Sequence, residues 1–192
     1  ALDTQLTDAQ YEYVSTVKSS ADALLSLLND ILDLSKIEAG KLDIDSTPFK
    51  LREMLGSTMR TVAVRAHQKN LELICDIDTD VPEVLVGDPA RLRQVIINLV
   101  GNAIKFTELG EIALRVCVES WSVGGINLHY TVADTGIGIP ADKLDHIFGA
   151  FEQVDTSTAR KYGGTGLGLA ISTQLVGLMG GRIWVESVVN QG

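Results

Sequence analysis

The amino-acid sequence predicts a two-layer α/β sandwich preceded by one long helix. Between residues 7 and 42, apolar residues recur at intervals of three and four, which is the spacing of one helical face. Farther along, several segments alternate apolar with polar residues, as strands with one buried face do. Helical stretches lie between these segments, so we expect helices to cover the apolar face of an antiparallel sheet.

The first helix is expected to span residues 7–42. Thr7 and Gln10 have the spacing of a capping box at its start, and Gly40 lies near its end. Such an apolar stripe needs a partner helix, so we expect a bundle or coiled coil, with homodimerisation through this helix as one arrangement. The stripe consists of Val14, Val17, Ala21, Leu24, Leu28 and Ile31.

The sandwich then begins with a second helix, from after Pro48 to about Gln68. Strands are expected at 71–77 and 84–86. Asp88 followed by Pro89 is a typical helix start, with Asp at the N-cap and Pro at the first helical position, and this helix should run to about Phe106.

The second half of the sandwich contains two more alternating segments, at 112–118 and 126–132, around the pair Gly124-Gly125. A short helix near 142–147 leads into a long polar loop. A helix at 166–178 and a strand at 182–188 complete the prediction.

The composition narrows the class of protein. A chain of 192 residues suits one large domain, or one domain with an appendage, and its net charge of −9 argues against nucleic-acid binding. We expect a cytoplasmic location, because the sequence has no signal peptide and no apolar run long enough to span a membrane. Cys75 and Cys117 are isolated, which suits a reducing compartment, and we interpret both as apolar filler.

Three polar residues share one face of the helix at 92–107. Asn98, Asn102 and Lys105 are spaced at i, i+4 and i+7, while apolar residues occupy the other faces. An amide oxygen is a hard ligand that suits Mg²⁺, and a lysine there could contact phosphate. The alternative interpretation is a polar face exposed to solvent.

The stretch DTGIGIP, residues 134–140, follows directly after a predicted strand. A carboxylate at the end of a strand can accept a hydrogen bond from an exocyclic amine such as adenine N6, and Asp134 is placed for this. A simple Asp-Thr-Gly turn is the alternative. The same three residues open aspartic-protease motifs, but the second copy that those enzymes need is absent.

A glycine-rich stretch, YGGTGLGLAIS at 162–172, precedes the last predicted helix. It is neither a P-loop, because Leu169 follows Gly168, nor a dinucleotide-binding turn, because Leu169 takes the place of the last glycine. Helix N-termini attract anions, and Arg160, Lys161 and Thr165 add donors. The loop at 149–165 has the length of a functional lid.

Together these stretches resemble the N, G1, F and G2 boxes of sensor histidine kinases. The matching patterns are N-x-x-x-N-A-x-K-F at 98–106, D-x-G-x-G at 134–138, F-x-x-F at 148–151 and G-x-G-x-G at 164–168. FEQVDTSTARKYGGTGLGL is most similar to the hybrid kinases, which carry a receiver domain downstream. The helix ending in LNDILDLSKIEAGKL resembles the second helix of their dimerisation and phosphoacceptor module.

The resemblance implies a Bergerat-type ATP-binding fold over residues 46–192, with a mixed, mostly antiparallel sheet covered by helices on one face, and an incomplete bundle over 1–45. It implies binding of ATP or ADP with Mg²⁺. Asp134 would read adenine, Asn102 would hold Mg²⁺, and Lys105 would contact phosphate. The complete implied site is Asn98, Asn102, Lys105, Phe106, Asp134, Gly136, Gly138, Ile139, Arg160, Lys161, Gly164, Thr165, Gly166, Leu167 and Gly168.

The expected activity is transfer of the γ-phosphoryl group of ATP to a histidine outside this chain, for relay to a response regulator or receiver domain. Hydrolases of the gyrase and mismatch-repair type carry a glutamate where this chain has Asn98, and an amide is no general base. A nucleotide-binding regulatory module without an acceptor remains the other alternative.

The acceptor histidine box of the family is absent from the 7–42 helix. His67, His129 and His146 lie elsewhere and are interpreted as structural. Both ends look cut, so we expect a fragment of a larger kinase that cannot phosphorylate itself. Its partners would be ATP, the acceptor helix of the parent kinase and a response regulator.

Overall fold

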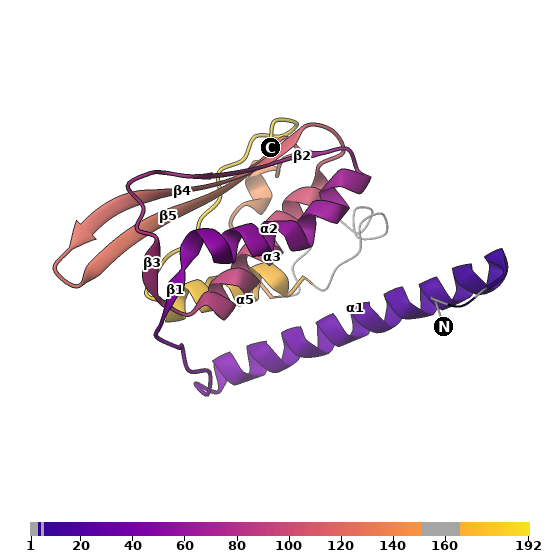
Figure 1. Cartoon of the computed structure of the whole chain (residues 1–192), viewed down its shortest axis with the longest axis horizontal. Coiled ribbons are helices and arrows are strands. Elements are labelled where there is room, and N and C mark those ends of the chain that lie inside the picture. The colour runs from indigo at the N-terminus through magenta and orange to yellow at the C-terminus, as the bar shows by residue number, and fades with distance from the viewer. Residues whose placement is uncertain (1–3, 5, 151–165) are drawn as a thin grey trace. The chain divides into compact units, whose positions relative to one another are not determined.

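The computed structural model describes residues 4, 6–150 and 166–192, and the chain divides into two units, 1–42 and 43–192 (Figure 1). In the described residues, no helix combines the length and the apolar character needed to cross a bilayer.

The first unit is a single helix, α1 (Asp8–Glu38). The predicted capping box is confirmed: Gln10 N donates to Thr7 Oγ1 over 3.3 Å, and Thr7 N donates to the Gln10 side chain over 3.0 Å. Gly40 follows the helix with φ of +61°, a left-handed conformation that favours glycine. The helical stripe is solvent-exposed at several of its apolar residues, including Val17 and Leu24.

The second unit contains a mixed sheet of three strands in the order β2-β4-β5. β2 (Glu72–Ile77) runs parallel to β4 (Glu111–Ser122), with Cys75 opposite Leu114. β4 runs antiparallel to β5 (Gly125–Asp134). A separate two-stranded antiparallel sheet pairs β1 (Thr47–Lys50) with β3 (Val84–Gly87).

In the described part of the second unit, three α-helices accompany these sheets: α2 (Leu51–Gln68), α3 (Pro89–Phe106) and α5 (Gly168–Leu178). Figure 1 shows α2 and α3 over one face of the three-stranded sheet, and α5 packs against α3. The core lies between α2, α3 and β4, where these side chains are at most 1% exposed: Leu51, Leu55, Ile96, Val100, Ile112, Leu114 and Val116. The predicted sandwich, with helices on one face of a mixed sheet, is confirmed.

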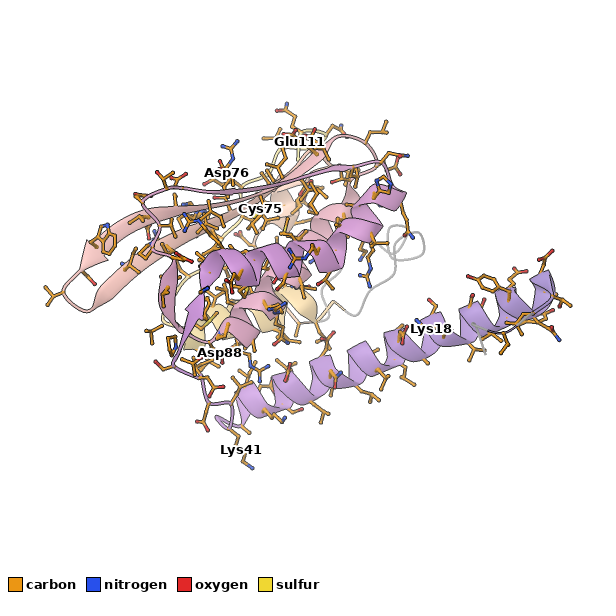
Figure 2. The ribbon with its side chains drawn as sticks, in the orientation of Figure 1. Lys18, Lys41, Cys75, Asp76, Asp88 and Glu111 are labelled. Atoms are coloured by element: carbon orange, nitrogen blue, oxygen red, sulfur yellow. The ribbon has the colours of Figure 1, made fainter. Side chains whose placement is uncertain are left out.

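Asp88 begins α3 as predicted (Figure 2). Its Oδ1 accepts hydrogen bonds from the backbone N–H groups of Ala90 and Arg91, each at 3.0 Å, and Pro89 occupies the first turn. Its Oδ2 accepts a third hydrogen bond from Asp45 N at 3.1 Å. This carboxylate is buried, so it both caps α3 and holds the segment before β1.

The prediction missed β1, where a helix was expected from Pro48 onward. Pro48 lacks an N–H donor, but it lies on a strand with only one neighbour, opposite Val86 of β3. The partner strand lies more than thirty residues later, so no local pattern could indicate the pairing.

Three further predictions were wrong in detail. No strand forms at 182–188, although burial there alternates; side-chain contacts hold this segment, such as Arg182 with Glu119 at 3.3 Å and Trp184 with His129 at 5.0 Å between ring centroids. The helix expected near 142–147 is a single 3-10 turn, η1 (Ala141–Lys143). Cys75, interpreted as filler, is exposed.

Candidate nucleotide site

The polar face of α3 meets the beginning of α5. Asn98 Nδ2 donates a hydrogen bond to Ser172 Oγ over 2.8 Å, and Ser172 is only 2% exposed. Gly168 lies against the same side chain: a Cβ there would contact Asn98 Oδ1 and lie 2.9 Å from its amide carbon. A side chain at this position would require the Asn98 amide to shift, so the first residue of α5 approaches α3 closely.

Asn102 and Lys105 follow Asn98 along α3, and both are half-buried. Lys105 Nζ lies 4.6 Å from the centre of the Phe106 ring, within reach of a cation–π interaction. Burial lowers the pKa of Lys105 from its ordinary value. A phosphate beside this ammonium would favour its charged form.

Asp134 is the last residue of β5, and its carboxylate is turned toward its own backbone. Its Oδ1 accepts a hydrogen bond from Gly136 N over 2.8 Å, as in an Asx turn, and lies 3.5 Å from Thr107 Oγ1. Because Oδ1 already accepts from Gly136, the exocyclic amine of a nucleotide base would donate its hydrogen bond to Oδ2.

Gly136 is buried against the end of α3. A Cβ there would lie 2.7 Å from both Phe106 O and Asp134 Oδ1, and 3.0 Å from Thr107 Oγ1. Ile137 N also lies 3.4 Å from Phe106 O as a hydrogen-bond donor. The turn that carries Asp134 is therefore fixed to the C-terminal end of the helix that carries Lys105.

The second glycine of this turn, Gly138, has φ of +65°. A Cβ there would lie 2.8 Å from the carbonyl carbon of Val188, so both conformation and space require glycine. Ile139 N donates to Ser187 Oγ over 2.8 Å, and Asn190 N donates to Ile137 O over 2.8 Å. Residues 187–190 thus support the turn from its other side.

At the start of α5, Gly166 has φ of +70° and Leu167 is buried. No side chain among the described residues caps the N-terminus of this helix. Arg160, Lys161, Gly164 and Thr165, together with most of the predicted loop at 149–165, lie outside the described residues.

Sequence reasoning missed three residues around the site: Lys69, Thr107 and Ser172. Lys69 Nζ donates to the carbonyl oxygens of Ile104, Lys105 and Thr107, and Thr107 is fully buried beside Gly136. Ser172 begins the short polar run Ser172-Thr173-Gln174 within the mostly apolar helix α5, and this run was a signal that could have indicated it. No local pattern marked Lys69 or Thr107.

The asparagine amide oxygens on α3 are the kind of metal ligand that suits one divalent cation bound together with phosphates. In the part of the chain that the structure describes, no group of three His, Cys, Asp or Glu side chains could hold a metal. The amide nitrogen of Asn98 is engaged by Ser172, and its oxygen is turned toward Gly168. Mg²⁺ prefers oxygen ligands, and it needs only a few from the protein when substrate phosphates complete its coordination shell.

Comparison with known proteins gives two family matches. Residues 87–192 match the family described as histidine kinase-, DNA gyrase B- and HSP90-like ATPase, and residues 1–40 match the His Kinase A (phospho-acceptor) domain. The chain is 48% identical over 188 residues, 98% of its length, to the sensor protein GacS of Pseudomonas syringae pv. syringae. It is 47% identical over 191 residues, 100% of its length, to the signal transduction histidine-protein kinase BarA of Escherichia coli K12.

The chain spans 21% of the length of each of these two relatives. Among solved structures, it is similar to full-length ShkA in complex with AMPPNP, with a TM-score of 0.80 and 36% sequence identity. That match covers 99% of this chain and 38% of the ShkA chain.

Proposed function

Because this chain belongs to the family of histidine kinase-, DNA gyrase B- and HSP90-like ATPases, we propose that residues 46–192 are the ATP-binding catalytic domain of a two-component sensor histidine kinase. The domain binds ATP and presents its γ-phosphoryl group to a histidine that another segment or chain supplies. The names of the similar proteins GacS and BarA, and the nucleotide analogue bound by ShkA, support this assignment.

The observation that carries the proposal is that a glycine from each of the two glycine motifs lies directly against α3. Gly136 lies against Phe106 O at the end of the helix, and Gly168 lies against Asn98 two turns earlier. The carboxylate of Asp134 and the N-terminus of α5 are thus placed along one helix. A nucleotide lying on that helix would have its base at Asp134 and its phosphates toward Gly168.

We assign the individual roles accordingly. Asp134 accepts the exocyclic amine of adenine, and Lys105 and the N–H groups at the start of α5 receive the phosphates. Asn102, with Asn98 one turn before it, would hold Mg²⁺, which when bound would offset negative charge on the phosphates. Phe106, Gly138, Ile139, Gly166 and Leu167 complete the walls, and Arg160, Lys161, Gly164 and Thr165 belong to the same assignment from the sequence alone.

Asn98 favours phosphoryl transfer over hydrolysis. Its amide donates to Ser172 and has no basic atom with which to activate water. Phosphoryl transfer needs mainly positioning and charge stabilisation, which such a site can supply once an acceptor is present.

The acceptor is proposed to lie outside this chain. Residues 1–40 match a phospho-acceptor domain but contain no histidine. His67 is exposed on α2, His146 is exposed beyond η1, and His129 stacks on Trp184. We assign residues 1–45 as the second helix of the bundle, whose exposed stripe would pair with the acceptor helix of a full kinase or with a second copy.

Calorimetric titration with ADP and AMPPNP, with and without Mg²⁺, tests the proposal. We expect binding of both nucleotides and tighter binding with Mg²⁺. Asp134→Asn replaces an acceptor with a mismatched amide and should weaken ADP at least about tenfold, from the loss of a charge-assisted hydrogen bond. No binding by the wild-type chain at millimolar nucleotide would contradict the function itself.

Two further measurements test the metal and the acceptor. Asn102→Asp should alter the Mg²⁺ dependence of ADP binding, and an unaltered dependence would remove Asn102 from the metal site. Incubation with ATP labelled at the γ-phosphate should leave this chain unlabelled. Acid-labile label on His67, His129 or His146 would show that the acceptor is internal.

A further inference from the structure

Lys69 joins the end of α2 to the end of α3. Its backbone is the C-cap of α2, while its side chain reaches the last turn of α3, 35 residues later. Its Nζ donates to Ile104 O over 2.7 Å, to Lys105 O over 3.0 Å and to Thr107 O over 3.2 Å. The Lys69 ammonium has three N–H donors, so it can donate one hydrogen bond to each of these three carbonyl oxygens.

The end of α3 is a natural place for a cation. The last carbonyl groups of a helix have no partner within the helix, and the helix dipole makes this end negative. Lys69 therefore satisfies carbonyl groups that would otherwise require water. These hydrogen bonds by themselves would stabilise the folded state.

The same helix end also carries the base side of the nucleotide site. In the sequence, Phe106 lies between Lys105 and Thr107, and its carbonyl oxygen accepts a hydrogen bond from Ile137 N over 3.4 Å. Gly136 has no spare room against Phe106 O and Thr107 Oγ1, and its N–H holds Asp134 Oδ1 at 2.8 Å. A shift of the α3 end would therefore move the Gly136 turn and turn the carboxylate of Asp134.

We propose that Lys69 is a positioning residue for base recognition: it holds the 104–107 corner of α3 at the place where Gly136 can fix the orientation of Asp134. Lys69 acts through that corner and does not touch the nucleotide. The phosphate-binding groups at Asn98 and Gly168 lie about two helical turns from this cluster. Lys105, also assigned to the phosphates, belongs to the cluster through its backbone carbonyl, so a shift of its side chain would affect every nucleotide with the same phosphates equally. The inference rests on the proposed function, because it assigns adenine recognition to Asp134.

ADP and GDP separate positioning from stability, since they carry the same phosphates and differ in the base. Wild-type, Lys69→Gln and Val62→Ala chains are titrated with each nucleotide and Mg²⁺, at a temperature where circular dichroism shows every chain folded. Val62 is the matched control, because it is 3% exposed on α2, about two turns before Lys69, and its truncation lowers stability while keeping Lys69 and its hydrogen-bonding groups.

We expect Lys69→Gln to lower the ratio of GDP to ADP dissociation constants by about tenfold, because a displaced Asp134 affects recognition of the base while any shift of Lys105 affects both nucleotides alike. Val62→Ala should lower the unfolding midpoint and keep the wild-type ratio of GDP to ADP dissociation constants. A folded Lys69→Gln chain with the wild-type ratio would overturn the inference. Absence of ADP binding in the wild type would instead contradict the proposed function.

Lys69→Arg provides a second readout. The planar guanidinium keeps the charge but cannot direct its donors at three converging carbonyl groups as a compact ammonium does. Its ratio of GDP to ADP dissociation constants should lie between those of the wild type and Lys69→Gln. If Lys69→Gln does not fold, Lys69→Arg decides: a reduced ratio supports the positioning role, and the wild-type ratio overturns it.

Discussion

Asn98 on α3 and Ser172 on α5 are joined by a hydrogen bond of 2.8 Å between side chains that lie 74 residues apart in the sequence. The bond fixes which way the Asn98 amide faces, because its nitrogen is committed to Ser172. The amide oxygen of Asn98 therefore faces Gly168, at the start of α5. One buried hydroxyl thus orients the group that we assign to the metal and phosphate side of the site.

Ser172→Ala should test this relationship. It removes the acceptor and leaves the Asn98 amide with an unmet donor, so we expect a loss of about 1–2 kcal/mol in the free energy of unfolding, measured with urea. Thr173→Ala is the matched control, since the Thr173 hydroxyl donates to Leu169 O within the same helix. Equal stability of the two variants would show that the Asn98–Ser172 bond is dispensable.

Gly136→Ala should impair both folding and nucleotide binding. The added methyl group would lie 2.7 Å from Phe106 O, a backbone atom that cannot move aside freely. We expect a loss of about 1–3 kcal/mol in stability from overpacking, and weaker ADP binding in calorimetry. Gly101→Ala is the control: it lies within α3 with open space around it, and should raise stability by about 0.5–1 kcal/mol.

Asp88→Ala should destabilise the second unit by about 1–2 kcal/mol or more, because it removes the N-cap of α3. It also leaves Asp45 N without its 3.1 Å partner. Asp88→Asn should be intermediate, since its oxygen can still cap the helix while its NH₂ group faces the Asp45 N–H. Chemical denaturation of these variants beside the exposed Asp80→Ala checks the order, and an Asp88→Ala chain as stable as Asp80→Ala would contradict it.

Lys105 should make nucleotide affinity depend on pH in the alkaline range. Burial lowers the pKa of Lys105 below its ordinary 10.5, so raising the pH removes its charge earlier than for an exposed lysine. ADP affinity should therefore fall as the pH rises from 8 toward 10. In Lys105→Met the affinity should be lower at pH 8 and show no such fall, and a parallel fall in both chains would exclude Lys105 as the titrating group.

The effect of the same group on folding has the opposite sign. Because the pKa of Lys105 is lower in the folded than in the unfolded chain, the unfolded chain binds more protons between these two values. The contribution of Lys105 to the free energy of unfolding should therefore rise with pH across that interval. Urea titrations of wild type and Lys105→Met at pH 8 and pH 10 measure it by difference.

Local signals in the sequence predicted much of the fold. The capping box of Thr7 and Gln10, the Asp88-Pro89 helix start and the alternation of β4 and β5 depend on neighbouring residues and are found as predicted. The spacing of Asn98, Asn102 and Lys105 likewise placed them on one face of α3.

What the sequence did not reveal depends on contacts between distant segments. β1 exists only through pairing with β3, and Lys69 reaches carbonyl groups that carry no side-chain signature. Residues 182–188 have the alternation of a strand, but alternation reports which face is buried and not whether a neighbour supplies a hydrogen-bond ladder. Ser172 could be noticed as polar, yet its partner could not be identified from spacing.

The separation of 74 residues between Asn98 and Ser172 has a consequence for the order of folding. Helix α1 can nucleate from contacts three residues apart, such as Thr7 with Gln10. The phosphate side of the site forms only when the chain between these two residues has closed into a loop. Closure of such a long segment carries a larger entropic cost than a local contact does. We therefore expect the helices and the β4–β5 hairpin to form in a chain that still lacks the proposed binding site, and competence to bind nucleotide to follow later in folding.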